Sequence, residues 1–222
     1  MRRFFFLLLL TLLAAAAVAQ ELPEGTPAAL GEAPTIDGTL EEGEWDDATR
    51  IELETTWIWL KHDGESLYIG LRGQTRSFGN VCVMYGEQVY MLRASDGIGT
   101  AIYDPAGAGW SPKTQFGAKL RQKATNKAIQ AKRDEYFEAW GWIANNRNTG
   151  KLQDMEYRIS LGLIGIENPK VAITYTDREH TKETSSWPTD LDDGCLHEAV
   201  LRGATPSQLA IDPDSWATII LE

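Results

Sequence analysis

The sequence predicts a mostly β protein, an antiparallel β-sandwich with one inserted amphipathic helix. Three observations predict this fold class. Most of residues 50–103 alternate apolar and polar side chains with a period of two, as half-buried strands do. Turn residues separate these runs at short spacing, which is typical of a sandwich. Only residues 125–139 have the composition and spacing of a long amphipathic helix.

The N-terminal 1–19 residues have the features of a cleaved signal peptide. A basic pair, Arg2 and Arg3, precedes the apolar run of residues 4–13, and a small-residue cleavage motif ends at Ala19. The run is too short to span a bilayer, which needs about 20 apolar residues. We therefore expect a secreted or periplasmic protein with no membrane span.

The rest of the chain is long enough for one domain. Residues 20–33 contain two prolines, two glycines and no apolar period, so they are expected to form a linker. The predicted sandwich domain covers residues 34–203. Residues 204–222 are expected to form a C-terminal tail, whose small apolar end at 216–221 could pack as a last edge.

The domain begins with a turn and a tryptophan. Asp37-Gly38 is a turn signal, because glycine tolerates positive φ and aspartate can accept a hydrogen bond from its own backbone. Thr39 can cap a short helix whose first turns are acidic. Trp45 and Ala48 are three residues apart on that helix, which predicts that Trp45 is a buried anchor.

The first half of the domain then reads as successive strands. Residues 56–61 and 67–72 flank a four-residue turn and predict a hairpin. The remaining runs with strand character in this half are 50–54, 81–85, 88–92 and 100–103. A glycine-rich loop at 105–109 is expected to end at Trp110.

The second half contains the predicted helix and the closing strands. In residues 125–139 and just after, Ile129, Tyr136 and Trp140 share one helical face. A basic strip accompanies the helix and could meet an anionic glycan or simply face solvent; it comprises Lys119, Arg121, Lys123, Lys127, Lys132 and Arg133. Further strands are expected at 141–144, 155–163, 171–175 and 195–201.

Charge and cysteine content limit the function classes. Without Arg2 and Arg3, 19 basic residues remain against 32 acidic ones, a net charge of −13. Nucleic-acid binding depends on lysine and arginine neutralising phosphates, so this balance argues against it. Cys82 and Cys195 could form a disulfide in an oxidising compartment or remain two separate buried thiols.

Three segments carry a resemblance to a known family. The turn, acidic stretch and tryptophan of residues 34–48, the hairpin of residues 61–71 and the acid-bearing strand of residues 155–163 resemble the landmarks of family 9 carbohydrate-binding modules, which are related to DOMON domains. The resemblance implies a β-sandwich that binds sugars without cleaving them. It also implies that structural calcium could be present and that a separate glycoside hydrolase could be a partner.

The resemblance also implies where a sugar would bind. Family members hold sugar ends between two loop tryptophans, and Trp187 matches one of them, although it could instead pack within its loop. Phe78 stands where the second tryptophan is expected, and Trp110 is the other candidate for stacking on a sugar ring. The candidates for binding sugar hydroxyls are Arg76, Asp190 and Asp192.

The sequence gives less support for catalysis, calcium binding or haem binding. No motif fixes the pair of carboxylates that a glycosidase needs. Two acidic groups could bind Ca²⁺ or simply face solvent; they are Asp190, Asp192 and Asp193, and Glu41, Glu42, Asp46 and Asp47. Some DOMON relatives bind haem through methionine and histidine, for which the candidates are Met84, Met91, Met155, His62, His180 and His197.

The sequence therefore favours a secreted, non-catalytic protein that binds a glycan or sugar end through loop aromatics, in support of polysaccharide breakdown. The alternative is a structural or interaction domain of the cell envelope without a sugar site. The phenylalanine at position 78, followed by the apolar residues 81–85, favours this alternative.

Overall fold

The structure is a computed structural model, and it describes residues 25–74, 77–94, 98–118, 127–164, 168–177, 183–201 and 204–222. The expected signal peptide therefore lies outside the described residues. The strands are β1 (Thr26–Leu30), β2 (Thr49–Glu52), β3 (Trp57–His62), β4 (Ser66–Gln74), β5 (Ser77–Tyr85), β6 (Gln88–Ala94), β7 (Ile98–Ala106), β8 (Gly109–Ala118), β9 (Trp142–Thr149), β10 (Leu152–Ser160), β11 (Lys170–Asp177), β12 (Thr184–Trp187) and β13 (Ala217–Leu221). The helices are α1 (Lys127–Trp140), α2 (Leu161–Ile164) and α3 (Glu198–Leu201), with 3₁₀ turns η1 (Gly194–Leu196) and η2 (Pro213–Ser215).

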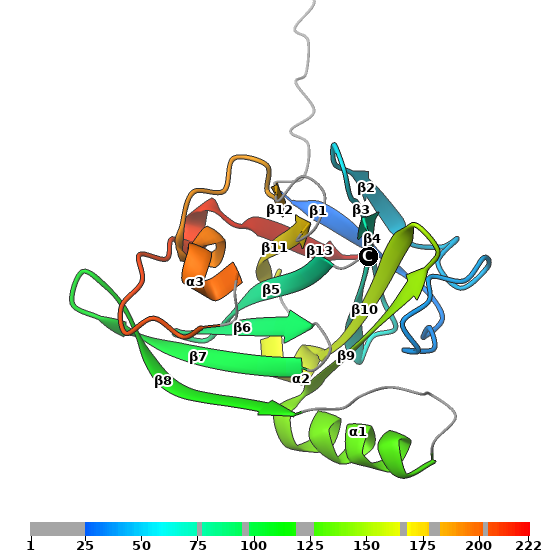
Figure 1. Ribbon diagram of the computed structural model, residues 1–222, viewed down its shortest axis with the longest axis horizontal. Helices are drawn as coiled ribbons and strands as arrows, with labels where there is room; N and C mark the ends of the chain where they lie inside the picture. The colour runs from blue at the N-terminus through cyan, green and yellow to red at the C-terminus, as the bar shows by residue number, and fades with distance from the viewer. Residues whose placement is uncertain are drawn as a thin grey trace, which may run out of the picture.

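The strands form a mostly antiparallel β-sandwich, which confirms the predicted fold class. One layer has the order β8-β7-β6-β5-β11-β13, with β12 also paired to β11. The other has the order β3-β4-β10-β9, with β2 also paired to β3. Figure 1 shows the two layers, with α1 near β9 at one end of the molecule. Among the described helices, none is both long and apolar enough to span a membrane.

The two layers are joined through β1. This strand pairs in parallel with β13 on one side and with β3 on the other. Residues 26–30 were expected to belong to a linker, so this part of the prediction is wrong. β1 forms backbone hydrogen bonds with two strands that are distant in the sequence. A segment rich in proline and glycine contains no local pattern that predicts such pairing.

The main core lies between the inner faces of the layers. Ile58 and Leu71 contribute from one layer, and Val81, Leu92 and Ile173 from the other, all at 1% exposure or less. The period of two therefore sorts side chains correctly in β3 to β7, because each strand buries one face in this core.

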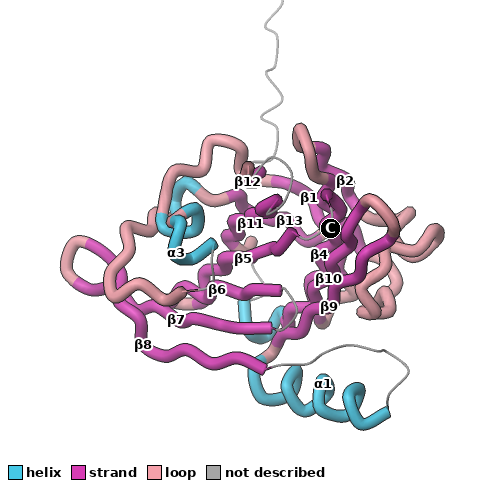
Figure 2. Tube along the Cα trace, in the orientation of Figure 1, coloured by secondary structure: helices cyan, strands magenta, loops and turns pink. Residues whose placement is uncertain are grey.

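A second, smaller core covers the outer face of the β5–β8 layer. Cys82 and Met91 of that face pack against Cys195, Val200 and other side chains of residues 191–216. A disulfide joins Cys82 to Cys195, whose Cα atoms are 6.5 Å apart. Figure 2 shows that the chain linking β12 to β13 is mostly loop with short helical turns. We call residues 191–211 the covering segment.

Four other predicted elements need correction. Residues 195–201 form η1 and α3 instead of a strand, and residues 39–48 form successive turns instead of a short helix. The predicted glycine-rich loop near 105–109 is the tight β7–β8 turn, and β8 then continues for ten residues. The tail contributes β13, which lies between β11 and β1 instead of at an edge.

Candidate functional site

An open cleft lies on the outer face of the β5–β8 layer, beside the covering segment. Its volume is about 410 Å³, within the range of small-molecule sites. We call it the polar cleft; its lining residues include Asn80, Met91, Arg93, Ala101, Gln115 and Val200. Strand alternation places them there, since Val81 and Leu92 point into the main core and their neighbours along the strands point outward. Val200, one of these lining residues, belongs to α3.

The floor of the polar cleft is formed partly by bare backbone. Gly99 of β7 and Gly117 of β8 are directly opposite each other in the ladder, and both line the cleft. Two side chains are therefore missing from this face at adjoining positions. Glycine within strands often marks a place where a ligand approaches the backbone closely.

Three side chains give the polar cleft its hydrogen-bonding character. Asn80 is 2% exposed, and its Nδ2 donates to Thr174 Oγ1 at 3.3 Å. Arg93 donates from Nη1 to the Val200 carbonyl at 3.3 Å, which fixes the guanidinium against the covering segment. Gln115 is exposed at the mouth of the cleft. An amide, a guanidinium and a second amide thus line one opening next to the apolar Met91 and Val200.

Phe78 lies beside this cleft, under Arg93. The Arg93 guanidinium carbon is 4.5 Å from the centre of the Phe78 ring, within the range of a cation–π contact. Phe78 is only 3% exposed. Its ring therefore supports Arg93 in this structure and does not present an open stacking surface.

Trp187 and Phe78 lie on opposite faces of the same layer. Trp187 is opposite Ile173 across the β11–β12 ladder, and Phe78 is opposite Thr176 across the β5–β11 ladder. Ile173 and Thr176 are three residues apart, so their side chains point to opposite faces. Trp187 is 8% exposed and belongs to the main core. The structure does not bring the two expected stacking residues together.

The remaining predicted binding residues are dispersed. Trp110 is the second residue of β8 and packs on the second core, where its Nε1 donates to the Ile211 carbonyl at 2.9 Å. Asp190 and Asp192 are exposed and do not line the polar cleft. Arg76 lies outside the described residues.

The acidic groups considered for calcium are used within the fold or remain apart. Asp193 accepts hydrogen bonds from Cys195 N, Asp212 N and Trp216 Nε1, at 2.8, 3.2 and 2.7 Å. Asp47 forms an ion pair with Lys61 at 2.8 Å. Across the described ranges, no group of three His, Cys, Asp or Glu side chains is placed to hold a metal ion.

The residues considered for haem are also separated. Met155 is fully buried in the main core, whereas Met91 belongs to the second core. His62 is 7% exposed, and its Nε2 is 2.8 Å from the Glu222 carbonyl oxygen. His180 lies outside the described residues. No described histidine lines the polar cleft.

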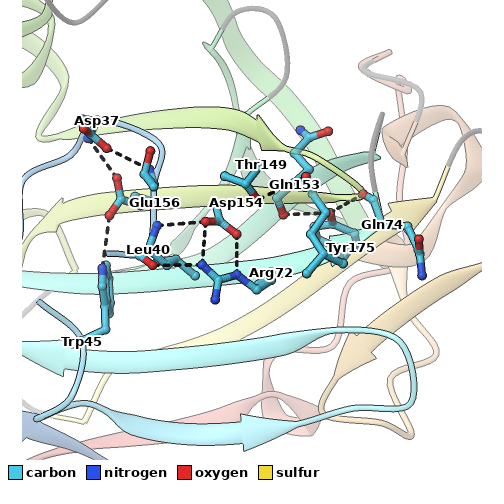
Figure 3. Close-up of polar contacts among 12 residues, drawn as sticks. Asp37, Leu40, Trp45, Arg72, Gln74, Thr149, Gln153, Asp154, Glu156 and Tyr175 are labelled. Atoms are coloured by element: carbon cyan, nitrogen blue, oxygen red, sulfur yellow. Dashed lines mark hydrogen bonds and ion pairs between the residues drawn. The ribbon is translucent and has the colours of Figure 1, made fainter. Parts of the chain in front are cut away.

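Two buried carboxylates attach residues 37–45 to the outer face of β10 (Figure 3). Glu156 accepts hydrogen bonds from the backbone N–H groups of Asp37 and Gly38 and from Trp45 Nε1, at 2.9, 2.6 and 3.2 Å. Burial raises the pKa of Glu156 to about 8, against the opposing effect of these donors. Trp45 is 4% exposed, which confirms its predicted role as an anchor.

The second carboxylate, Asp154, is paired with an arginine. Arg72 donates from Nε and Nη2 to Asp154 at 2.6 and 2.7 Å, and Leu40 N donates to the same carboxylate at 3.0 Å. Hydrogen bonding to Asp154 raises the pKa of Arg72. Because the partners of both acids are groups of the fold itself, we assign Asp154 and Glu156 a structural role.

The sequence interpretation missed most of the polar cleft. Asn80, Arg93 and Gln115 were not candidates, although Asn80 and Arg93 interrupt apolar runs at positions that alternate with core residues. They could have been identified as polar residues at the strand positions whose side chains point away from the core, in strands that are otherwise apolar. Gln115 carried no such signal, because β8 itself was not predicted.

Comparisons with known proteins return structures of carbohydrate-binding proteins. This chain is similar in structure to a family 9 carbohydrate-binding module from Caldicellulosiruptor kristjanssonii in complex with glucose. The similarity covers 88% of this chain and 94% of that one, with 11% identity and a TM-score of 0.48. A structure of such a module from the same organism with cellotriose has 10% identity over 89% and 93% of the chains and a TM-score of 0.46. A candidate carbohydrate-binding protein from Bacteroides uniformis has 8% identity over 89% and 100%, with a TM-score of 0.45. No family model and no curated protein sequence matches the chain.

Proposed function

We propose that the protein binds a carbohydrate non-catalytically in the polar cleft. The observation that carries the proposal is the combination of a side-chain-free floor at Gly99 and Gly117 with Asn80, Arg93 and Gln115 around it. Sugars have many hydroxyl groups, each of which donates and accepts hydrogen bonds. Amide groups can serve both roles, and a guanidinium supplies several donors in a fixed plane.

Apolar contact in this cleft comes from aliphatic groups. Met91 and Val200 line it, and their side chains can pack on the C–H groups of a pyranose ring. Phe78 acts indirectly, by holding the plane of Arg93. The proposal therefore replaces stacking between two tryptophans with hydrogen bonding over a flat backbone floor.

The proposal includes the cellular setting that the sequence suggests. The signal-peptide features of residues 1–19 support export, and the Cys82–Cys195 disulfide agrees with an oxidising compartment. An exported sugar-binding protein without its own chemistry would support polysaccharide breakdown by a separate glycoside hydrolase. A mixture with polysaccharide should then release no reducing sugar unless that hydrolase is added.

The proposal is tested by calorimetric titration of the mature protein with a panel of neutral mono- and oligosaccharides. Glucose and cellotriose, the sugars in the similar structures, come first. We expect saturable binding of at least one sugar. Arg93→Ala and Gln115→Ala should each weaken it by about tenfold, the equivalent of about 1.4 kcal/mol.

Arg147→Ala is the matched control, because Arg147 is an exposed arginine at the end of β9, in the other layer. Its sugar affinity should equal that of the unsubstituted protein. If no sugar of the panel binds, or if all three variants behave alike, the polar cleft is not a sugar site. A structural or interaction domain then becomes the better description, and the burial of Phe78 and Trp187 already favours it.

A further inference from the structure

The polar cleft has a buried inner end and an exposed outer end. Asn80, Met91 and Val200 line the inner end and are 2, 5 and 5% exposed. Gln115 and Gly117 line the outer end and are exposed on β8, the last strand on that side of the layer. A ligand therefore inserts one group among the three buried side chains and leaves its remainder toward β8.

Two rows of residues cross the floor of the cleft, one polar and one apolar at the inner end. In the first row, Asn80 is directly opposite Arg93, which is directly opposite Gly99. In the second row, Met91 is directly opposite Ala101. The rows are two residues apart along β6, or about 7 Å. A single ligand group of a few atoms can therefore contact both rows at once.

Asn80 brings an unpaired acceptor to the inner end. Within the described part of the chain, its only hydrogen bond runs from Nδ2 to Thr174 Oγ1 at 3.3 Å, so its carbonyl oxygen Oδ1 accepts none. Oδ1 is not among the described polar atoms that are sealed from solvent without a partner, and Asn80 lines the cleft. An acceptor in so buried a residue is costly to leave unpaired. The inner end therefore favours a ligand group that donates a hydrogen bond.

The side chains next to this acceptor are apolar. Met91 and Val200 both belong to the second core and both line the inner end. A sugar hydroxyl that donated to Asn80 would place a polar group against these two side chains, which offer it no strong hydrogen-bond partner. A group that combines one N–H with one methyl matches the acceptor and the apolar surface together.

We propose that the inner end of the polar cleft binds the acetamido group of a 2-acetamido sugar, such as N-acetylglucosamine or N-acetylgalactosamine. The acetamido N–H donates to Asn80 Oδ1, and the methyl group packs on Met91 and Val200. Arg93, directly opposite Asn80, is the donor on this wall for the acetamido carbonyl. The pyranose ring then lies over the side-chain-free floor, with the rest of a glycan leaving toward β8.

This inference rests on the function proposed for the same cleft and names the class of sugar. An unsubstituted hexose can lie over the floor, but it leaves the apolar contact at Met91 and Val200 unused. A free amino sugar has the N–H groups without the methyl, and the Arg93 guanidinium repels its ammonium group. The cleft should therefore prefer the N-acetylated form over both.

The test is a calorimetric titration of the mature protein with N-acetylglucosamine and N-acetylgalactosamine, each compared with its parent hexose, and with glucosamine. We expect at least one N-acetyl sugar to bind saturably and about tenfold more tightly than its parent hexose, from one added hydrogen bond and one buried methyl group. Glucosamine should bind more weakly than either.

Two variants separate the polar contact from the apolar one. Asn80→Leu keeps the size of the side chain but removes the acceptor, so the preference for the N-acetyl sugar should be lost. Val200→Thr replaces a methyl group by a hydroxyl, so the preference should fall by about threefold while hexose binding is unchanged. Asn148→Leu makes the same change as Asn80→Leu at an exposed position of β9, in the other layer, and should keep the full preference.

The outcomes distinguish this inference from the proposed function. If a hexose binds as tightly as its N-acetyl derivative, or if the preference persists in folded Asn80→Leu, the acetamido site is wrong while sugar binding by the protein stands. If no sugar binds, both proposals fail. If Asn80→Leu does not fold, the side-chain amide resonances of Asn80 in the unsubstituted protein should shift saturably with N-acetylglucosamine. Unchanged resonances at saturating N-acetylglucosamine would then overturn the inference.

Discussion

Glu156 shows how one buried residue couples the fold to pH. Its three donors come from residues 37–45, which the carboxylate attaches to β10. Asp37 and Glu44 are close enough to raise its pKa further, beyond the effect of burial. This position was visible in the sequence as the acid of an otherwise strand-like run, yet its partners were not, because they lie 111 to 119 residues away.

The pKa of Glu156 predicts a fall in stability as the pH rises. Between its usual pKa of 4.5 and about 8, the unfolded chain releases the proton that the folded protein keeps. The unfolded state then binds fewer protons, so the free energy of unfolding decreases with pH. At about 1.4 kcal/mol per pKa unit, the decrease is no more than about 5 kcal/mol. Urea denaturation at a series of pH values measures it.

Substitution isolates the contribution of this one group. Glu156→Gln cannot ionise, so its free energy of unfolding should change less between pH 5 and pH 8 than that of the unsubstituted protein. Glu52→Gln, an exposed glutamate on β2, should retain the full pH dependence. A pH dependence of Glu156→Gln identical to that of the unsubstituted protein would show that Glu156 is ionised in the fold.

Among the helices and strands, those whose hydrogen-bond partners lie nearby in the sequence were predicted best. Strands β3 to β7 were predicted because turns and alternation act within a few residues. Strand β1 was missed, and β13 was expected only as an edge. The two strands pair with each other across nearly the whole chain, which leaves no local pattern for this pairing. Residues 195–201 also alternate like a strand, but the disulfide at Cys195 and the Asp193 cap fix η1 there, and α3 follows.

The same reasoning explains why the predicted binding residues did not converge. Trp187 was assigned to a loop, where its direction is free, whereas it ends β12 and takes its direction from the pairing with β11. The ladder register thus sends it into the main core, away from Phe78. Composition could suggest an aromatic site, but only the register decides which face each ring occupies.

We predict that Trp187 affects stability and not sugar affinity. Trp187→Phe keeps a ring in the core but leaves a gap, so it should lower the free energy of unfolding by about 1–2 kcal/mol. Sugar affinity at the polar cleft should remain within twofold of the unsubstituted value, as measured by titration alongside denaturant unfolding. A large loss of affinity in a folded Trp187→Phe protein would restore Trp187 as a binding residue.

At the scale of the molecule, the disulfide connects the covering segment to the β5–β8 layer. It links residues 113 positions apart, and Val200, five residues after Cys195, forms part of the wall of the polar cleft. The link therefore stabilises both the fold and the position of one side of the proposed site.

We expect the paired substitution Cys82→Ala/Cys195→Ala to lower the free energy of unfolding by about 2–5 kcal/mol. A closed loop of this length restricts the unfolded chain strongly, and that restriction is lost. Sugar binding at the polar cleft should weaken as well. Denaturant unfolding with and without reductant measures the effect, and reductant should not affect the doubly substituted protein. Equal stability of the two proteins would mean that the disulfide contributes nothing.

The position of β13 has a consequence for the order of folding. In the described sheet path this strand, residues 217–221, is the only neighbour that connects β11 to β1, and through β1 to the second layer. Of the described strands, β13 is the last to be synthesised. The two layers therefore cannot be joined along this edge until all the other described strands have been synthesised.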